Sequence, residues 1–220
     1  MAEHVDDTRN RLLDAAGEIF AEKGFQAATV REICGRAGAN LAAVNYHFRD
    51  KKTLYVETVR HAQSCGLQEP PPGLFEGLTP DEKLREYIHR MLSRLFDPQR
   101  PSWHTRLLAH EMTEPCPACL EMVGAYVRAN FDLLNRILAE FLPPETTQAD
   151  CHLAAFSVIG QCLHFKIGRA VMELLVGPEE LQTYDVARLV DHIAQFSLAA
   201  LRRKGPAVVA DNRTSEVTER

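Results

Sequence analysis

The sequence predicts an all-α protein with a small N-terminal helical domain and a larger C-terminal helical domain. Apolar residues recur at helical spacing in each long segment between the Gly and Pro breaks. Two Thr residues are each followed three positions later by Glu, the spacing of a capping box that opens a helix. These pairs are Thr29 with Glu32 and Thr79 with Glu82.

The first predicted helix covers about residues 7–23. Leu12, Leu13, Ala16, Ile19 and Phe20 give it one apolar stripe. Gly24 is expected to end it, because glycine readily adopts the positive φ found after many helices. Residues 1–6 are polar and are expected to form a loose arm.

A helix-turn-helix is predicted over residues 29–48, TVREICGRAGANLAAVNYHF. Thr29 caps a helix that begins at Val30 and ends at Gly38. Asn40 can then cap a second helix, Leu41 to Phe48. Four residues are spaced so that both helices turn an apolar face to one core: Ile33, Ala37, Val44 and Phe48.

The second helix of this motif has the size of a DNA-recognition helix. Its eight residues span about 12 Å, and the major groove is about 12 Å wide. Ala42 and Ala43 permit a close approach, Asn45 can pair with adenine, and Tyr46 and His47 can donate to phosphates. Asp50 is expected to cap the next helix, which begins with Lys51 and Lys52 and runs to about residue 65.

Helix, Gly turn and helix also fit an ordinary helical hairpin. Residues 8–62, however, resemble the DNA-binding domain of the TetR family of transcriptional regulators, through the first helix, Thr29, Ile33, Ala37-Gly38, His47-Phe48, Lys51 and Leu54. Asn45 departs from that pattern, which usually has Tyr there. The resemblance and the motif together assign DNA contact to Thr29, Val30, Arg31, Leu41, Ala42, Ala43, Asn45, Tyr46, His47 and Lys51.

The composition indicates a globular chain of 220 residues, with 45% hydrophobic residues and a net charge of −5. Residues 1–66 have nine Lys or Arg and nine Asp or Glu, whereas the remainder has 16 and 21. The N-terminal part is therefore less acidic, as local DNA binding requires. No apolar run is long enough to span a membrane and the start is not a basic signal peptide, so we expect a cytoplasmic protein without membrane contact.

Pro and Gly residues mark the boundary between the two domains. We predict a DNA-binding domain at 1–66, a linker at 67–79, an effector-binding and dimerisation domain at 80–204, and a disordered tail at 205–220. The predicted helices of the second domain cover about 80–95, 103–112, 117–142, 148–176 and 184–203.

The last two of these helices have more apolar surface than one subunit can bury. In a homodimer they would form a four-helix bundle and place two recognition helices about one DNA turn apart on a palindromic site.

Residues 80–203 resemble the C-terminal domain of the CecR (YbiH-like) subgroup, through LLAHEMTEPCPACLEMV, NFDLLNRILAEFLPP and SVIGQCLHFKIGRA. The resemblance implies a small-molecule effector pocket among these helices. The present sequence departs from the pattern of the subgroup at His110, Cys116 and Cys119. An aromatic lining with a few polar groups is typical of such pockets. Our candidates are Met91, Trp103, His110, Met112, Phe131, Gln161, His164 and Phe165, each of which also fits plain core or, for Gln161 and His164, an interface hydrogen bond.

Cys116 and Cys119 form a CxxC at a predicted helix start, where the helix dipole would lower a thiol pKa. A thiol- or metal-responsive regulator is therefore an alternative, although the remaining Cys and His residues do not have ligand spacing, and thiols without function fit too. We expect no cofactor and no resident metal.

An enzyme is the rival class, but the chain lacks a phosphate loop, HExxH and GxSxG. The sequence favours a repressor that an effector releases from its operator, while constitutive repression stays open.

Overall fold

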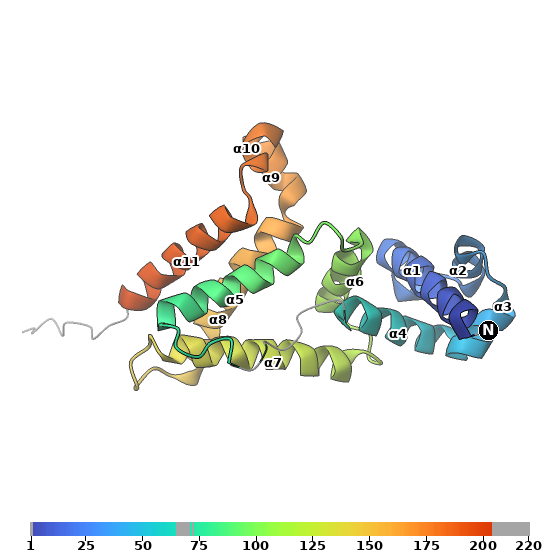
Figure 1. The fold of residues 1–220 in the computed structure, drawn as a ribbon, viewed down its shortest axis with the longest axis horizontal. Coiled ribbons are helices and arrows are strands. Elements are labelled where there is room, and N and C mark those ends of the chain that lie inside the picture. Colours follow the sequence, from blue (N-terminus) through green and yellow to red (C-terminus); the bar gives the residue numbers. More distant parts are fainter. Residues whose placement is uncertain (1, 65–70, 72, 204–220) are drawn as a thin grey trace, which may run out of the picture.

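The computed structural model describes residues 2–64, 71 and 73–203, and all the regular structure within them is helical. The predicted tail at 205–220 and part of the predicted linker, 67–70 and 72, lie outside the described residues. Figure 1 shows an elongated molecule with α1–α4 at one end and α5, α7, α8 and α11 at the other, and α6 between them.

Four helices form the N-terminal end: α1 (Ala2–Ala27), α2 (Val30–Ala37), α3 (Leu41–Phe48) and α4 (Lys51–Ser64). The polar arm predicted at residues 1–6 is wrong, because α1 is helical from Ala2. Gly24 interrupts α1 with a φ of 72° and a ψ of 171°, which confirms the predicted break at this residue.

The C-terminal end contains α5 (Pro80–Leu95), α7 (Leu120–Ala139), α8 (Gln148–Ile167) and α11 (Val186–Arg203). The capping box at Thr79 is present, since its hydroxyl accepts from the Glu82 amide and the Glu82 carboxylate accepts from the Thr79 amide. Leu84, Ile88, Leu134 and Ile193 are among the buried residues of the core that these four helices share.

The helix predicted over 148–176 is divided in the structure. Gly168, with a ψ of 3°, separates α8 from α9 (Arg169–Val176). A short α10 (Pro178–Gln182) follows, and both helices stand away from the bundle at the top of Figure 1. Glycine is a frequent site of sharp helix bends, so this division has a local cause.

The helix α6 (Ser102–Thr113) packs on the N-terminal helices, although it follows α5 in the chain. Trp103 and Leu107 belong to the same buried cluster as Leu12, Phe20 and Tyr55. Gly17 of α1 faces the Trp103 ring so closely that an added Cβ would lie 2.3 Å from ring carbons. Only glycine permits this approach, and α1 and α6 are therefore tightly packed.

Candidate DNA-recognition surface and effector cavity

The first helix of the helix-turn-helix, α2, begins and ends as its sequence predicts. The Thr29 hydroxyl accepts from the Glu32 amide at 3.3 Å, and the Glu32 carboxylate accepts from the Thr29 amide at 3.1 Å. Lys23 pairs with the same carboxylate at 2.5 Å, and the hydrogen bonds from Lys23 and Thr29 lower the pKa of Glu32 to about 2. Gly38, in the left-handed region at a φ of 60°, ends the helix.

The recognition helix α3 buries one face and exposes the other. Asn40 caps it, because its side-chain oxygen accepts from the Ala43 amide at 2.9 Å. Val44 and Phe48 are buried against Ile33 and the rest of the N-terminal core. On the opposite face Tyr46 is 77% exposed, and the side chains that are exposed with it are Leu41, Ala42 and Asn45. The face predicted to meet DNA is thus accessible.

The turn after α3 is strained at Arg49. This residue has a φ of 67° and a ψ of −53°, and the Asp50 amide donates to the Phe48 carbonyl at 2.8 Å. That combination is a γ-turn of the rarer kind, which costs energy for a residue with a side chain. Asp50 then caps α4, since its carboxylate accepts from the Thr53 amide at 2.7 Å and this bond lowers the Asp50 pKa.

The remaining predicted DNA contacts differ in how accessible they are. Thr29 and Arg31 are exposed at the start of α2, and Val30, Ala43 and His47 are half-buried. The Lys51 ammonium donates to the Gln26 carbonyl at 3.2 Å and lies 4.7 Å from the Phe25 ring centroid. Lys51 therefore ties the start of α4 to the end of α1, while its neighbour Lys52 is exposed.

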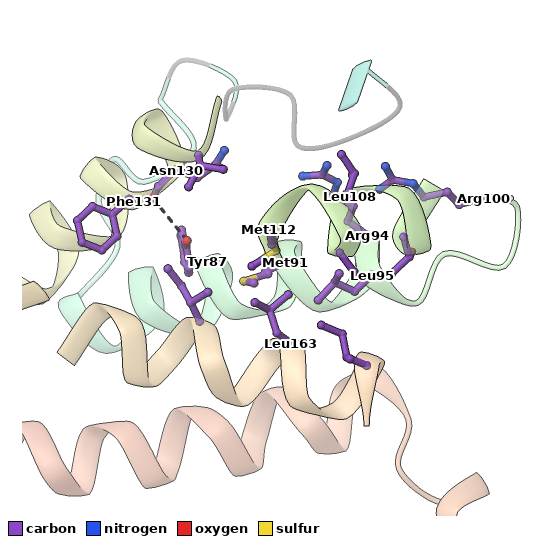
Figure 2. A pocket seen from close by; sticks show the side chains of 15 residues that line it. Tyr87, Met91, Arg94, Leu95, Arg100, Leu108, Met112, Asn130, Phe131 and Leu163 are labelled. Carbon is purple, nitrogen blue, oxygen red and sulfur yellow. Dashed lines mark hydrogen bonds between the residues drawn. The ribbon is translucent and has the colours of Figure 1, made fainter. Parts of the chain in front are cut away.

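A cavity of about 180 Å³ lies among α5, α6, α7 and α8. It is largely apolar, and Figure 2 shows Arg94 and Arg100 at one end, Met91 and Met112 in the middle, and Phe131 at the other end. At the Phe131 end the Tyr87 hydroxyl donates to the Asn130 carbonyl at 3.4 Å. A mostly apolar space with a few polar groups is typical of a small-molecule site.

Three of the eight predicted effector residues line this cavity: Met91, Met112 and Phe131. The other five lie elsewhere. Trp103 is in the N-terminal core, His110 faces Gly24, and the Gln161 amide donates to the Ser157 carbonyl at 3.2 Å. His164 is exposed, and Phe165 packs on the C-terminal core.

Most of the lining was not among the predicted residues. Tyr87, Leu95 and Leu163 belong to the apolar stripes of their helices, and periodicity does not separate a cavity-lining residue from a core residue. Arg94 and Arg100 have no sequence signal, because a single Arg near a helix end is usually solvated. The others are Thr105, Leu108, Ala109, Val127, Asn130, Ile159 and Ile167.

Glu111 is a buried carboxylate that sequence reasoning missed. The Tyr55 hydroxyl of α4 donates to it, and the Cys116 amide donates to the same carboxylate at 3.2 Å. Burial, followed by the nearby Glu111, raises the pKa of Cys119 to about 12. The expectation of a lowered thiol pKa in the CxxC is therefore wrong for Cys119, because burial outweighs the helix dipole here.

No helix in the described part of the chain is long and apolar enough to cross a membrane. Within those same residues, no group of three or more His, Cys, Asp or Glu side chains is arranged to hold a metal ion. Cys34, Cys116, Cys119, Cys151 and Cys162 are all free thiols.

An accessible recognition helix at one end and a ligand-sized cavity in the helical bundle at the other define a helix-turn-helix transcriptional regulator. Residues 12–58 match the family described as bacterial regulatory proteins, tetR family. Residues 80–201 match the C-terminal domain of the HTH-type transcriptional dual regulator CecR. The chain belongs to the TetR family of DNA-binding transcriptional regulators, with a C-terminal domain of the CecR type.

Among curated relatives, the transcriptional dual regulator CecR of Shigella flexneri is 26% identical over 182 residues, which cover 78% of this chain and 81% of CecR. The transcriptional activator FasR of Mycolicibacterium smegmatis is 31% identical over 137 residues, 60% of each chain.

Two solved structures have the same fold. HlyIIR, a hemolysin II transcriptional regulator, has a TM-score of 0.60 at 23% identity and covers 86% of this chain and 97% of its own. AibR, in complex with isovaleryl coenzyme A and operator DNA, has a TM-score of 0.63 at 13% identity, with the same coverage. These two comparisons concern the fold alone.

Proposed function

We propose that this regulator is a homodimeric repressor that binds a palindromic operator and leaves it when a small molecule occupies the cavity. The observation that carries the proposal is the accessible face of α3, where Asn45 and Tyr46 are exposed while Val44 and Phe48 are buried. A helix held rigidly from behind, with polar side chains in front, suits insertion into the major groove.

Within this proposal the residues divide by the part of DNA that they contact. Asn45 reads a base edge, and Tyr46 and His47 donate to phosphates. Arg31 is placed to contact phosphate from α2, and Lys51 from the start of α4. The remaining residues proposed to contact DNA have small or apolar side chains: Thr29, Val30, Leu41, Ala42 and Ala43.

A second copy of the chain is the partner that we assign to the outer faces of α8 and α11. Leu153 and Phe156 of α8 and Phe196 of α11 are each about 60% exposed. Large apolar side chains on adjoining helices are typical of a subunit interface. Pairing α8 and α11 across a two-fold axis gives a four-helix bundle and two recognition helices that match a palindrome.

Effector control is proposed from the cavity and from related folds. FadR of Bacillus subtilis is a relative of this fold that was solved with stearoyl-CoA, at a TM-score of 0.59. Because α6 contributes both to the cavity and to the N-terminal core, a ligand that prefers one position of α6 shifts the population of operator-binding dimers. A differential affinity of about 1–3 kcal/mol is enough for such control.

Selection of bound sequences from random duplex DNA tests the proposal, followed by a screen for small molecules that release the selected duplex. We expect a two-fold symmetric consensus and at least one releasing compound. An asymmetric consensus would contradict the dimer on a palindrome, and release by no compound would leave constitutive repression.

The dimer is tested separately by sedimentation of a variant with Phe156→Glu and Phe196→Glu. We expect this variant to sediment as a monomer and to bind the operator weakly. Ala139→Glu, an exposed position on α7, is the control and should remain dimeric. A wild-type monomer at micromolar concentration would exclude the bundle.

A further inference from the structure

The cavity is chemically polarised along its length. Its described lining contains two arginines and no aspartate or glutamate. Arg94 and Arg100 lie together at one end in Figure 2, and the other labelled side chains are mainly apolar or aromatic. A ligand that complements this lining has a negative group at one end and an apolar body.

Further positive charge lies near the arginine end. Lys166 of α8 stands 5.3 Å from the centroid of the Phe96 ring, and Ile167, its neighbour in sequence, lines the cavity. Burial and then the charges of Arg169 and Arg100 lower the pKa of Lys166, as expected for cations gathered in a partly buried place.

Arg100 also contacts the DNA-binding domain. Its guanidinium donates to the main-chain carbonyl of Ala62 and, at 3.1 Å, to Nδ1 of His104. Ala62 lies in the last described turn of α4, so this hydrogen bond joins α4 to the residues just before α6.

We propose that the cavity binds an organic anion with a short apolar tail, such as a carboxylate, and that the anion competes with the Ala62 carbonyl for Arg100. The proposal rests on the effector control proposed above and gives it a ligand class and a responding contact. When the guanidinium turns to the ligand, α4 loses this hydrogen bond to the residues just before α6. The helix that positions the recognition motif is then held less firmly to α6.

The cavity size limits the apolar part of the ligand. A cavity of about 150 Å³ in another protein holds one benzene molecule, and the volume here is about 180 Å³. Octanoate therefore serves as the probe, because its hydrocarbon tail has about as many carbon atoms as benzene. Octanamide has nearly the same shape without the charge and is its matched partner.

The experiment measures binding of both probes to the full-length chain by calorimetry. We expect octanoate to bind wild type at least about tenfold more tightly than octanamide, since hydrogen bonds to charged groups are the stronger kind. Arg94→Gln and Arg100→Gln should each weaken octanoate binding about 10- to 100-fold. Arg106→Gln, an exposed arginine on α6 outside the lining, should leave it unchanged. Equal binding of octanoate and octanamide to wild type would overturn the ligand class without any variant.

A second measurement tests the role of the Ala62 contact. Octanoate should release wild type from its selected operator, whereas Arg100→Gln should bind the operator more weakly before any ligand is added and respond little to octanoate. An Arg100→Gln protein that folds, binds the operator like wild type and is still released by octanoate would overturn the competition. If a neutral compound releases the operator and octanoate does not bind, the proposed repressor stands and this inference fails. If wild type binds no operator, the repressor proposal fails, while the comparison of the two probes still decides the ligand class.

Discussion

The Tyr55 hydroxyl donates to the Glu111 carboxylate, and both side chains are buried between α4 and α6. Burial, with the adjacent carboxylate, raises the pKa of Tyr55, so the phenol keeps its proton and remains a donor. The Cys116 amide is the second donor to Glu111. This carboxylate joins α4, the helix that follows the recognition motif, to α6, which lines the cavity.

Tyr55→Phe should lower the free energy of unfolding by about 1–3 kcal/mol, because a buried carboxylate loses a hydrogen-bond donor. Chemical denaturation measures the change. Tyr184→Phe is the control, since Tyr184 donates to Glu180 at 2.5 Å on the surface and its removal should cost under about 0.5 kcal/mol. Equal effects of the two substitutions would contradict the special position of Glu111.

His104 should make stability depend on pH between about 4 and 6.5. Burial, and then the charges of Arg100 and His61, lower the pKa of His104 from 6.5 to about 4. Within that window the unfolded chain binds more protons, so stability rises with pH and is lost as the pH falls. The loss attributable to this group is at most about 3 kcal/mol. Denaturation of wild type and His104→Gln at pH 7 and pH 4.5 should show a smaller decline for the variant, and equal declines would contradict a neutral buried His104.

Asn45→Ala combined with Tyr46→Ala should abolish discrimination between the selected operator and random duplex DNA. Each good base contact contributes about 1–3 kcal/mol of discrimination, and both side chains are exposed, so the fold should not suffer. Fluorescence anisotropy and circular dichroism measure the two effects. Arg60→Ala, exposed on α4, should bind like wild type. Retained operator preference in the double variant would place the recognition surface elsewhere.

Operator affinity should fall steeply with salt, because Lys and Arg side chains replace ions bound to the phosphates. Lys52→Gln should reduce the slope of log K against log salt by about one if Lys52 meets a phosphate. Lys83→Gln changes the same charge on α5, where Lys83 pairs with Glu140 at 2.9 Å, and should keep the wild-type slope. A salt-independent isotherm for wild type would contradict phosphate contacts altogether.

Cys119 should resist alkylation in the native chain, because its thiol is buried and its pKa is raised to about 12. Iodoacetamide at pH 8 followed by peptide mass mapping should modify the half-buried Cys151 before Cys119, which should react only after unfolding. Alkylation of Cys119 as fast as Cys151 would revive a thiol-responsive site at the CxxC.

The helix-turn-helix could be predicted from sequence because its determinants are local. A capping box at Thr29, a positive φ at Gly38 and a cap at Asn40 each act within four residues, and the structure contains all three. The family and the all-α fold could be predicted for the same reason. The helical spacing of apolar residues likewise predicted most of the C-terminal helices.

The cavity could be predicted only in part because it depends on packing between helices that are distant in the chain. Met91, Met112 and Phe131 line it, but Trp103, on the same helix as Met112, faces the opposite way toward α1. Nothing local in the sequence indicates that Trp103 meets Gly17. Arg100 was missed because its partner, the Ala62 carbonyl, is a main-chain group without a sequence signature.

The Trp103 ring packs so closely on Gly17 that a Cβ would not fit there, and α6 is therefore held close against α1. Thr105, Leu108 and Met112 form one wall of the cavity and lie on this same helix, which packs on α1 and α4 at the end of the molecule that contains α3. Under the proposed effector control, a ligand that displaces this wall also moves the N-terminal helices on which α6 packs. In the proposed effector control, ligand binding and the movement of α3 are thus coupled through the contact between α1 and α6.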